Sequence, residues 1–409
     1  MANFTDVIII GGGAGGLCSA VYLKQNYPHL SVRLLEGLPR VGKKLSITGN
    51  GRCNITNKEI NLSRYHGEEK DFAAFAITKY DRAFCEAFFS KIGVPFVYED
   101  NKAFPYSLQA SSVVDCLRFT ADNLGVITNT ETKVTNIQIE GGNYKIIAGN
   151  LNFLARNVII ATGLFSGTDR LGCDGSMLEI LKKAGFKTVN STPSLVQIKT
   201  ETDIVKQLKG VKCNALVTLK SDSEIIRSEY GETLFCDYGL SGPPVLQVSR
   251  EVARRNEKLY ISLDIMPEIS LDSLVQVLTQ RMANLSHLCL DEFFTGMLQK
   301  RLGQVIIKAS SLELSRRVNT LRQNDIMKIA KTIKSFDFAV TGNTGFANSQ
   351  VTAGGLKTSQ FDPKTMMSKT NKGLYCIGEI LDIDGDCGGF NLQWAWSSAF
   401  CACDSIGKA

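Results

Sequence analysis

The chain has 409 residues, of which 44% are hydrophobic and 21% are charged, and its formal net charge at pH 7 is +6. These values are ordinary for a soluble globular protein of two or three domains, and the mild positive charge permits contact with nucleic acid without requiring it. No stretch reaches the roughly 20 apolar residues of a membrane span. The first ten residues lack the basic start and apolar core of a secretory signal.

The twelve cysteines are scattered, without CxxC pairs or the paired Cys/His spacing of a zinc site. We therefore expect free thiols, no metal ion and a reducing, cytoplasmic setting. We expect no membrane partner, and the oligomeric state stays open.

The first elements form a βαβ unit. Residues 6–10 are a short β-branched run typical of a buried parallel strand, residues 14–25 have apolar side chains at helical spacing, and residues 31–36 predict a second strand. A polar loop follows over residues 40–57. Further along, the pattern predicts helices at 71–92, 111–124 and 176–184, and strands within 94–104, 126–138, 144–154 and 157–163.

The character of the chain changes near residue 191. Residues 196–260 hold several short strands with turn signals, typical of a β-barrel or sandwich, and residues 271–336 predict basic helices. Strands return at 338–353 and 372–380, and a last helix covers 392–405. We predict an α/β fold in which a Rossmann-type domain, residues 1–190 plus 340–409, is interrupted by a β-rich insert (191–265) and a helical insert (266–339).

A glycine cluster carries the clearest chemistry. Gly11, Gly13 and Gly16 form a GxGxxG motif between the first strand and the first helix, with Ala14 and Gly15 inside it. Such a turn lets the backbone approach a pyrophosphate at the positive end of the helix. Glu36 ends the second strand at about the twenty-residue spacing at which an acid accepts the adenosine ribose hydroxyls. The alternative is a glycine-rich turn that only packs.

Features elsewhere in the chain favour FAD over NAD. A classical dehydrogenase would continue with further βαβ units, whereas here a polar loop follows and a strand ending in Thr162-Gly163 comes late. In two-dinucleotide-binding flavoproteins a late strand ends on an acid that holds the ribityl chain, and the next helix points its N-terminus at the flavin. Gly378-Glu379 and the turn Gly389-Phe390-Asn391-Leu392 stand at those places.

The loop at residues 42–57 is the third cofactor feature. Glycines such as Gly49 permit close backbone approach to a ligand, and Lys43, Lys44 and Asn54 can bond phosphates, hydroxyls or the flavin edge. Asp384 can hold the ribityl chain or shape a turn. The alternative for the loop is a solvated basic surface.

Five motifs, GKKLSITGNGRCNITN, GLSGP, VTAGGL, GLYCIGEILDIDG and GGFNLQWAWSSA, resemble the BaiN/YhiN-like flavoproteins over residues 6–399. The resemblance implies a two-dinucleotide-binding type of FAD domain interrupted by a β-barrel-like domain and a small helical domain. It also implies that the backbone of Val134 meets the adenine. Around the FAD it implies Lys43, Lys44, Asn54, Glu379, Asn391 and Leu392.

The activities of that family are diverse. Some members are linked to the reduction of steroid-like enones, and one branch reduces a uridine of ribosomal RNA to dihydrouridine. Both reactions transfer a hydride from reduced flavin to an activated C=C bond, and the fold does not choose between them. Relatives often carry Thr-His ahead of GLSGP, where this chain has Cys236-Asp237, which puts any role of that histidine in doubt here.

A proton donor must accompany the hydride. Cys53 is the first candidate because its loop is expected at the flavin, and a thiol is mostly protonated at neutral pH. Cys387, next to Gly388-Gly389, is the second, and Arg52 is a candidate for binding an anionic substrate or the flavin phosphates. For each, the alternative is a packing or surface residue.

The electron donor and the substrate follow less directly. A second GxGxxG and a redox-active CxxxxC are absent from the sequence, so we expect NAD(P)H to visit the flavin transiently. Basic clusters at 300–301, 316–317 and 328–334 are candidate phosphate contacts, although a solvated helical face is the favoured interpretation. We rank three hypotheses: a reductase of ribosomal RNA uridine, a reductase of a small enone, and a non-catalytic FAD-holding module that binds RNA or protein.

Overall fold

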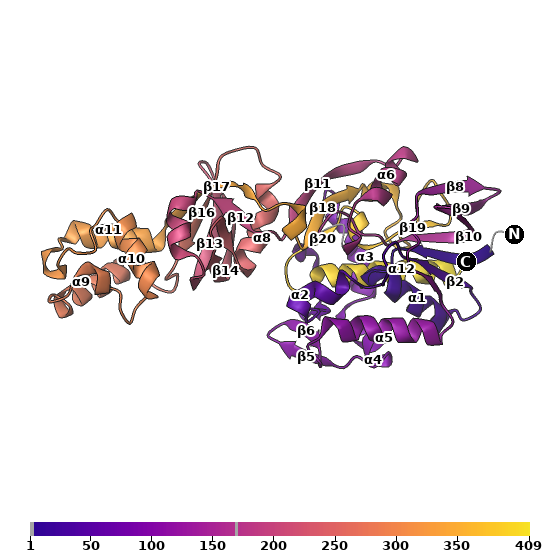
Figure 1. Ribbon diagram of the computed structural model, residues 1–409, viewed down its shortest axis with the longest axis horizontal. Helices are drawn as coiled ribbons and strands as arrows, with labels where there is room; N and C mark the ends of the chain where they lie inside the picture. The colour runs from indigo at the N-terminus through magenta and orange to yellow at the C-terminus, as the bar shows by residue number, and fades with distance from the viewer. Residues whose placement is uncertain (1–3, 168–170) are drawn as a thin grey trace. The chain divides into compact units, whose positions relative to one another are not determined.

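The computed structural model describes residues 4–167 and 171–409 (Figure 1). The chain forms two compact units, Met1–Pro193 with Phe346–Ala409, and Ser194–Gly345. Both carry mixed α/β structure, and the predicted fold class is confirmed. The division of the inserted region into a β-rich and a helical domain stays a prediction.

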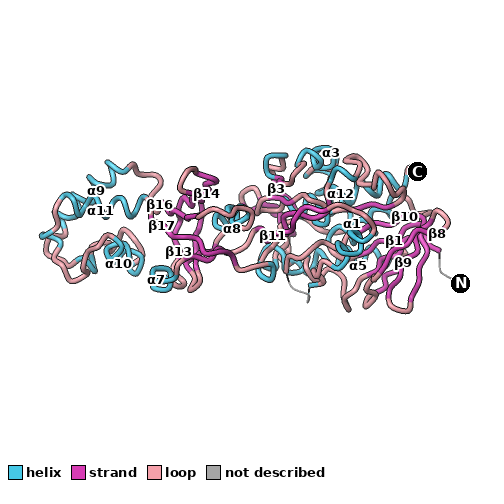
Figure 2. The backbone as a smooth tube through the Cα atoms, turned by 90° about the horizontal axis from the view of Figure 1, so that it is seen from above, coloured by secondary structure: helices cyan, strands magenta, loops and turns pink. Residues whose placement is uncertain are grey.

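The first unit is built on a sheet in the order β7-β2-β1-β10-β9-β8, with β19 also pairing with β10. Figure 2 labels β1, β10, β9 and β8 of this sheet. The parallel strands β1, β2 and β19 and the C-terminal half of β10 are buried, which agrees with their unbroken apolar runs. The strands are β1 (Phe4–Ile10), β2 (Val32–Leu35), β7 (Ile127–Asn129), β8 (Asn136–Glu140), β9 (Asn143–Ala148), β10 (Leu151–Ile160) and β19 (Leu374–Cys376).

Segments from both ends of the chain share this sheet and its core. Strand β10 pairs in parallel with β1, and also with β19, more than two hundred residues later in the sequence. Helix α1 (Ala14–Asn26) packs on α12 (Phe390–Gly407), whose Trp394, Trp396 and Phe400 are almost fully buried.

The remaining helices cover this core, and one differs from its prediction. Residues 71–92 do not form one helix. Helix α3 (Ala74–Lys79) ends at Tyr80, and Asp81 starts α4 (Arg82–Lys91) by accepting a hydrogen bond from the Phe84 N–H at 2.9 Å. An aspartate N-cap interrupts a helix that the phenylalanine spacing alone would continue. The other helices are α2 (Thr48–Gly51), α5 (Ala110–Asn123) and α6 (Ser176–Lys183).

Short strand pairs complete the unit. Strand β11 pairs with β18, so the chain leaves the first unit and returns to it on neighbouring strands. Strand β4 pairs with β20, and β6 lies between β3 and β5. Their bounds are β3 (Thr56–Asn57), β4 (Tyr65–His66), β5 (Phe96–Glu99), β6 (Lys102–Pro105), β11 (Thr188–Ser194), β18 (Val351–Leu356) and β20 (Asp384–Gly385).

The second unit contains a closed barrel in the order β12-β15-β14-β13-β16-β17, and a group of helices lies between β16 and β17 in the chain. Barrel strands and helices share one apolar core. The strands are β12 (Ile198–Thr200), β13 (Lys212–Ser221), β14 (Ile225–Phe235), β15 (Gly239–Ser241), β16 (Leu259–Asp264) and β17 (Phe336–Asn343). The helices are α7 (Thr202–Val205), α8 (Pro243–Val252), α9 (Leu271–Asn284), α10 (Lys300–Ala309) and α11 (Gln323–Lys334).

None of the described helices is both long enough and apolar enough to cross a lipid bilayer.

Candidate cofactor and active site

The glycine turn has the geometry that its sequence predicts. A Cβ on Gly16 would lie 1.8 Å from the Gly11 carbonyl oxygen, so only glycine lets helix and turn pack this closely. Gly11 itself has a φ of 104°, and a Cβ there would lie 2.6 Å from the Ala161 oxygen. A Cβ on Gly13, by contrast, would have nothing within 4 Å. The turn is closed towards the protein at Gly11 and Gly16 and open at Gly13.

Glu36 closes the far side of this turn. Its carboxylate accepts hydrogen bonds from the Gly12 N–H at 2.7 Å and the Leu38 N–H at 2.8 Å. Burial raises the pKa of Glu36 despite these bonds. The Thr132 N–H donates to the Glu36 backbone oxygen at 2.8 Å, which brings the segment that carries buried Val134 alongside. The carboxylate keeps lone pairs for hydroxyl donors.

Lys44 and Glu379 form an ion pair. The Lys44 ammonium lies 2.7 Å from one Glu379 carboxylate oxygen and also donates to Ser166. The Ser166 hydroxyl donates to the other Glu379 oxygen at 2.5 Å, and the Thr352 N–H donates to that oxygen at 3.1 Å. Burial acts to lower the pKa of Lys44, but the Glu379 charge outweighs it and the pKa is raised. Ser166 lies outside the sequence motifs, whereas Thr352 belongs to the VTAGGL motif, and the motif alone does not indicate that it contacts Glu379.

The loop before α12 meets the loop around Asn54. Gly389 has a φ of 98°, and a Cβ there would lie 2.7 Å from the Thr56 oxygen and 2.9 Å from the Asn54 Oδ1. That Oδ1 is buried and has no hydrogen-bond partner among the described residues. Buried acceptors are normally satisfied, so the atom fits a site whose donor comes from a ligand. The Asn57 side chain fixes the loop by donating to the Gly388 oxygen at 2.8 Å.

The other candidate cofactor residues surround these groups. A Cβ on Gly11 would lie 2.9 Å from the Cα of Thr162, which precedes Gly163. Gly378 accepts a hydrogen bond from the Trp394 indole at 3.0 Å. Gly15 and Phe390 are buried, as is Asp384, whereas Ala14, Lys43 and Leu392 are half-buried and Gly49 is exposed.

The three candidate catalytic residues differ in their surroundings. Cys53 is fully buried, and burial raises the pKa of its thiol to about 12, which makes it a weak proton donor at neutral pH. Burial also raises the pKa of half-buried Cys387. Arg52 is bound at 2.9 and 2.8 Å to the two carboxylate oxygens of Glu99 and lies over the Phe104 ring. Cys53 thus has the burial of a packing residue, and Arg52 already has a partner for its charge. The catalytic roles of these residues stay predictions.

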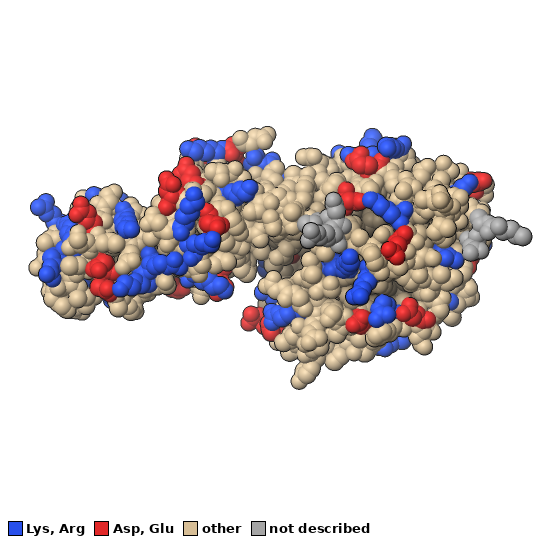
Figure 3. Space-filling model, viewed as in Figure 1, with Lys and Arg blue, Asp and Glu red and all other residues tan. Residues whose placement is uncertain are grey.

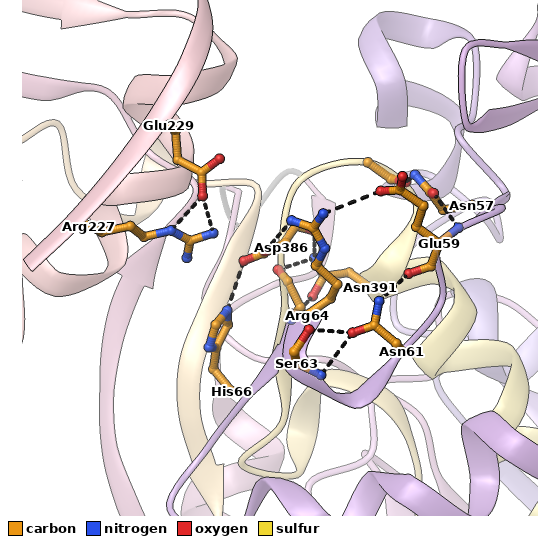
Figure 4. Close-up of polar contacts among 12 residues, drawn as sticks. Asn57, Glu59, Asn61, Ser63, Arg64, His66, Arg227, Glu229, Asp386 and Asn391 are labelled. Atoms are coloured by element: carbon orange, nitrogen blue, oxygen red, sulfur yellow. Dashed lines mark hydrogen bonds and ion pairs between the residues drawn. The ribbon is translucent and has the colours of Figure 1, made fainter. Parts of the chain in front are cut away.

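His66, which the sequence motifs do not single out, contacts the loop that precedes α12. The His66 Nε2 lies 2.8 Å from a carboxylate oxygen of Asp386, which is almost fully buried, and Arg64 lies 3.4 Å from the other oxygen (Figure 4). The Asn391 side chain donates to the Asp386 backbone oxygen at 3.2 Å. More than three hundred residues separate His66 from Asp386, and the pairing of β4 with β20 brings their segments together.

The basic residues of the second unit are interleaved with acidic ones on the face that Figure 3 shows. Lys300 lies 2.8 Å from Glu292, and Arg316 lies 2.8 Å from Asp325. Asp237, just before the GLSGP turn, pairs with Lys209 at 2.7 Å. Paired surface charges are typical of a solvated face, in line with the favoured interpretation of the basic clusters.

Comparisons with known proteins agree on the family. The family model described as HI0933-like protein Rossmann domain matches residues 5–405. A 3-dehydro-bile acid delta(4,6)-reductase of Clostridium scindens is 30% identical over 96% of this chain and 97% of its own length. The ribosomal RNA dihydrouridine synthase of Haemophilus influenzae is 26% identical over the full length of both chains.

A solved 3-ketosteroid-delta4-(5alpha)-dehydrogenase from Rhodococcus jostii shares the fold at 13% identity. Its TM-score is 0.51, and the match covers 100% of this chain and 97% of that one. The glycine turn, the acid that follows β2 and the full-length match together identify the chain as a member of the HI0933-like Rossmann-domain family and an FAD-dependent oxidoreductase.

Proposed function

We propose that this enzyme reduces a C=C bond conjugated to a carbonyl group, and that its substrate is a uridine of large-subunit ribosomal RNA. The carrying observation is that the full-length relatives are named for this one reaction type. Dihydrouridine is uridine reduced at the C=C bond next to a carbonyl, and a 3-dehydro bile acid with delta(4,6) unsaturation carries C=C bonds conjugated to its ketone.

The residues that fit FAD divide along the cofactor. The open turn at Gly13 would receive the pyrophosphate, and Glu36 would accept the ribose hydroxyls. Asn54 and Asn391 would surround the flavin end, with Lys44 and Glu379 as a charged pair beside it. When bound and reduced, FAD supplies the hydride. We propose NAD(P)H as the reductant.

The RNA substrate is tested in cells. In a strain that lacks the gene, mass spectrometry of large-subunit ribosomal RNA should show that one uridine position has lost its dihydrouridine. Expression of the intact gene should restore it. Unchanged dihydrouridine at every position would contradict the RNA substrate.

A small enone is the second candidate, because the bile acid reductase shares more identity with this chain than the ribosomal RNA enzyme does. The purified protein, reduced anaerobically, is mixed with ribosomal RNA or with a panel of α,β-unsaturated ketones, and reoxidation of the flavin is followed by absorbance. Fast reoxidation by an enone and none by RNA favours the second candidate. Reoxidation by RNA alone excludes it.

A further inference from the structure

We propose that His66 delivers the proton that accompanies the hydride, and that Asp386 orients its ring. This inference rests on the proposed reduction of a conjugated C=C bond. It assigns the general acid of the reaction to a residue other than a cysteine, because the Cys53 thiol is fully buried and its pKa of about 12 makes it a weak donor.

The ring of His66 is held from one side. Strand β4 pairs antiparallel with β20, with His66 opposite Asp384, and the Asp386 N–H donates to the Arg64 oxygen at 2.9 Å. These backbone bonds fix Asp386 so that its carboxylate meets the His66 Nε2 at 2.8 Å. The His66 side chain is 25% exposed, whereas that of Asp386 is 4% exposed. The histidine therefore presents an accessible ring against a buried, fixed carboxylate.

The contact determines which nitrogen exchanges the proton. A carboxylate accepts, so the Nε2 of His66 carries its hydrogen towards Asp386, and the Nδ1 is the nitrogen left to give and take a proton. Figure 4 shows Nδ1 on the side of the ring away from Asp386. Arg64 lies 3.4 Å from the second oxygen of Asp386, so both carboxylate oxygens have a nitrogen neighbour and the carboxylate that holds the ring is fixed.

The same loop carries the candidate flavin cradle. Asn391 donates to the backbone oxygens of Gly385 at 2.7 Å and Asp386 at 3.2 Å, so the loop that holds the carboxylate is tied to the first turn of α12. Gly388 and Gly389 complete the link, and the unpartnered Asn54 Oδ1 lies against Gly389. One short segment thus connects a titratable pair to the place where the cofactor residues converge.

The proposed step balances with one hydride and one proton. The hydride adds to the carbon β to the carbonyl, and the C=C electron pair moves to the α carbon. The α carbon forms its new C–H bond with the proton released from the His66 Nδ1, and the neutral imidazole then regains a proton from water. Both electrons come from the reduced cofactor.

The test uses the full chain and separates the two halves of the reaction. His66→Gln keeps an amide that can reach Asp386 and removes the titratable ring. His29→Gln, at an exposed histidine of the same unit, is the matched control. FAD per chain, anaerobic flavin reduction by NAD(P)H and flavin reoxidation by ribosomal RNA or an enone are measured for each. For His66→Gln we expect unchanged FAD content and reduction, with reoxidation slowed by about 10²–10⁴-fold.

The outcomes are distinguishable. If neither ribosomal RNA nor an enone reoxidises the flavin of the wild-type protein, the proposed function itself is contradicted. If the wild type is active and the flavin of the His66→Gln variant is reoxidised equally fast, the inference is overturned. Loss of FAD from that variant also overturns it, because it would mark a structural role. For Asp386→Asn we expect slower reoxidation and a shifted pH profile, and for His66→Ala partial rescue by added imidazole, which a purely structural contact would not give.

Discussion

Single carboxylates tie together elements that are remote in sequence. Asp404 of α12 accepts hydrogen bonds from the hydroxyls of Tyr22 at 2.9 Å, Tyr27 at 3.1 Å and Tyr80 at 2.9 Å, and Lys408 lies 2.8 Å away. Tyr22 lies in α1, Tyr27 ends α1 and Tyr80 ends α3. The Asp404 side chain therefore links α12 to α1 and α3. Burial acts to raise the pKa of Asp404, but the bonds from Lys408, Tyr80 and Tyr22 outweigh it and lower the pKa.

We therefore predict that Asp404→Asn lowers the free energy of unfolding by about 1–3 kcal/mol at pH 7, since bonds to a charged group are lost. The pKa is lower in the folded state. The stabilisation is thus complete above the ordinary Asp value of about 3.9 and is lost as the pH falls through the folded pKa. Thermal unfolding at pH 7 and near pH 3 should show that the difference in melting temperature between variant and wild type is smaller at the lower pH. Asp122→Asn, on the exposed side of α5, is the control, and an equal loss there would contradict the assignment.

At the scale of elements, the sequence predicts what depends on neighbours in the chain. The glycine turn, Glu36 and the barrel strands follow from local spacing, and the structure has them. The break at Tyr80-Asp81 was missed because an N-cap overrode a continuous phenylalanine pattern. The pairing of Lys44 with Glu379 and of His66 with Asp386 could not be read from spacing at all, because strand pairing and helix packing bring these residues together.

Two glycines of the turn should respond differently to a methyl group. We expect Gly16→Ala to destabilise the fold, because its Cβ would meet the Gly11 oxygen at 1.8 Å. Gly13→Ala should keep the apoprotein melting temperature, since its Cβ meets nothing within 4 Å, yet weaken FAD binding about tenfold or more, which is ~1.4 kcal/mol. Circular dichroism melting and FAD titration measure the two effects. A Gly13→Ala protein that binds FAD as tightly as wild type would show that the pyrophosphate lies elsewhere.

At the scale of the whole molecule, the chain has two separate apolar cores. One joins β1, β10 and α12, and the other joins the barrel strands to α9, α10 and α11. All candidate FAD residues belong to the first unit, so a ligand bound there stabilises that unit alone.

We predict two calorimetric unfolding transitions for the intact chain, of which added FAD raises only one. Hydrogen exchange with mass spectrometry should assign the FAD-sensitive transition to residues 4–193 and 346–409. A single transition that shifts as a whole with FAD would mean that the two cores unfold as one cooperative unit.

The pairing of β10 with both β1 and β19 also sets an order of events during translation. Residues 374–407, which supply the last sheet strand and helix α12 to the first unit, leave the ribosome only after every residue of the second unit has done so. The second unit can therefore complete its barrel while the half-built Rossmann sheet still exposes residues 158–160 of β10, which β19 later covers. The nascent chain should reach its flavin-binding form late, and the exposed edge in the interval is the natural place for a chaperone to act.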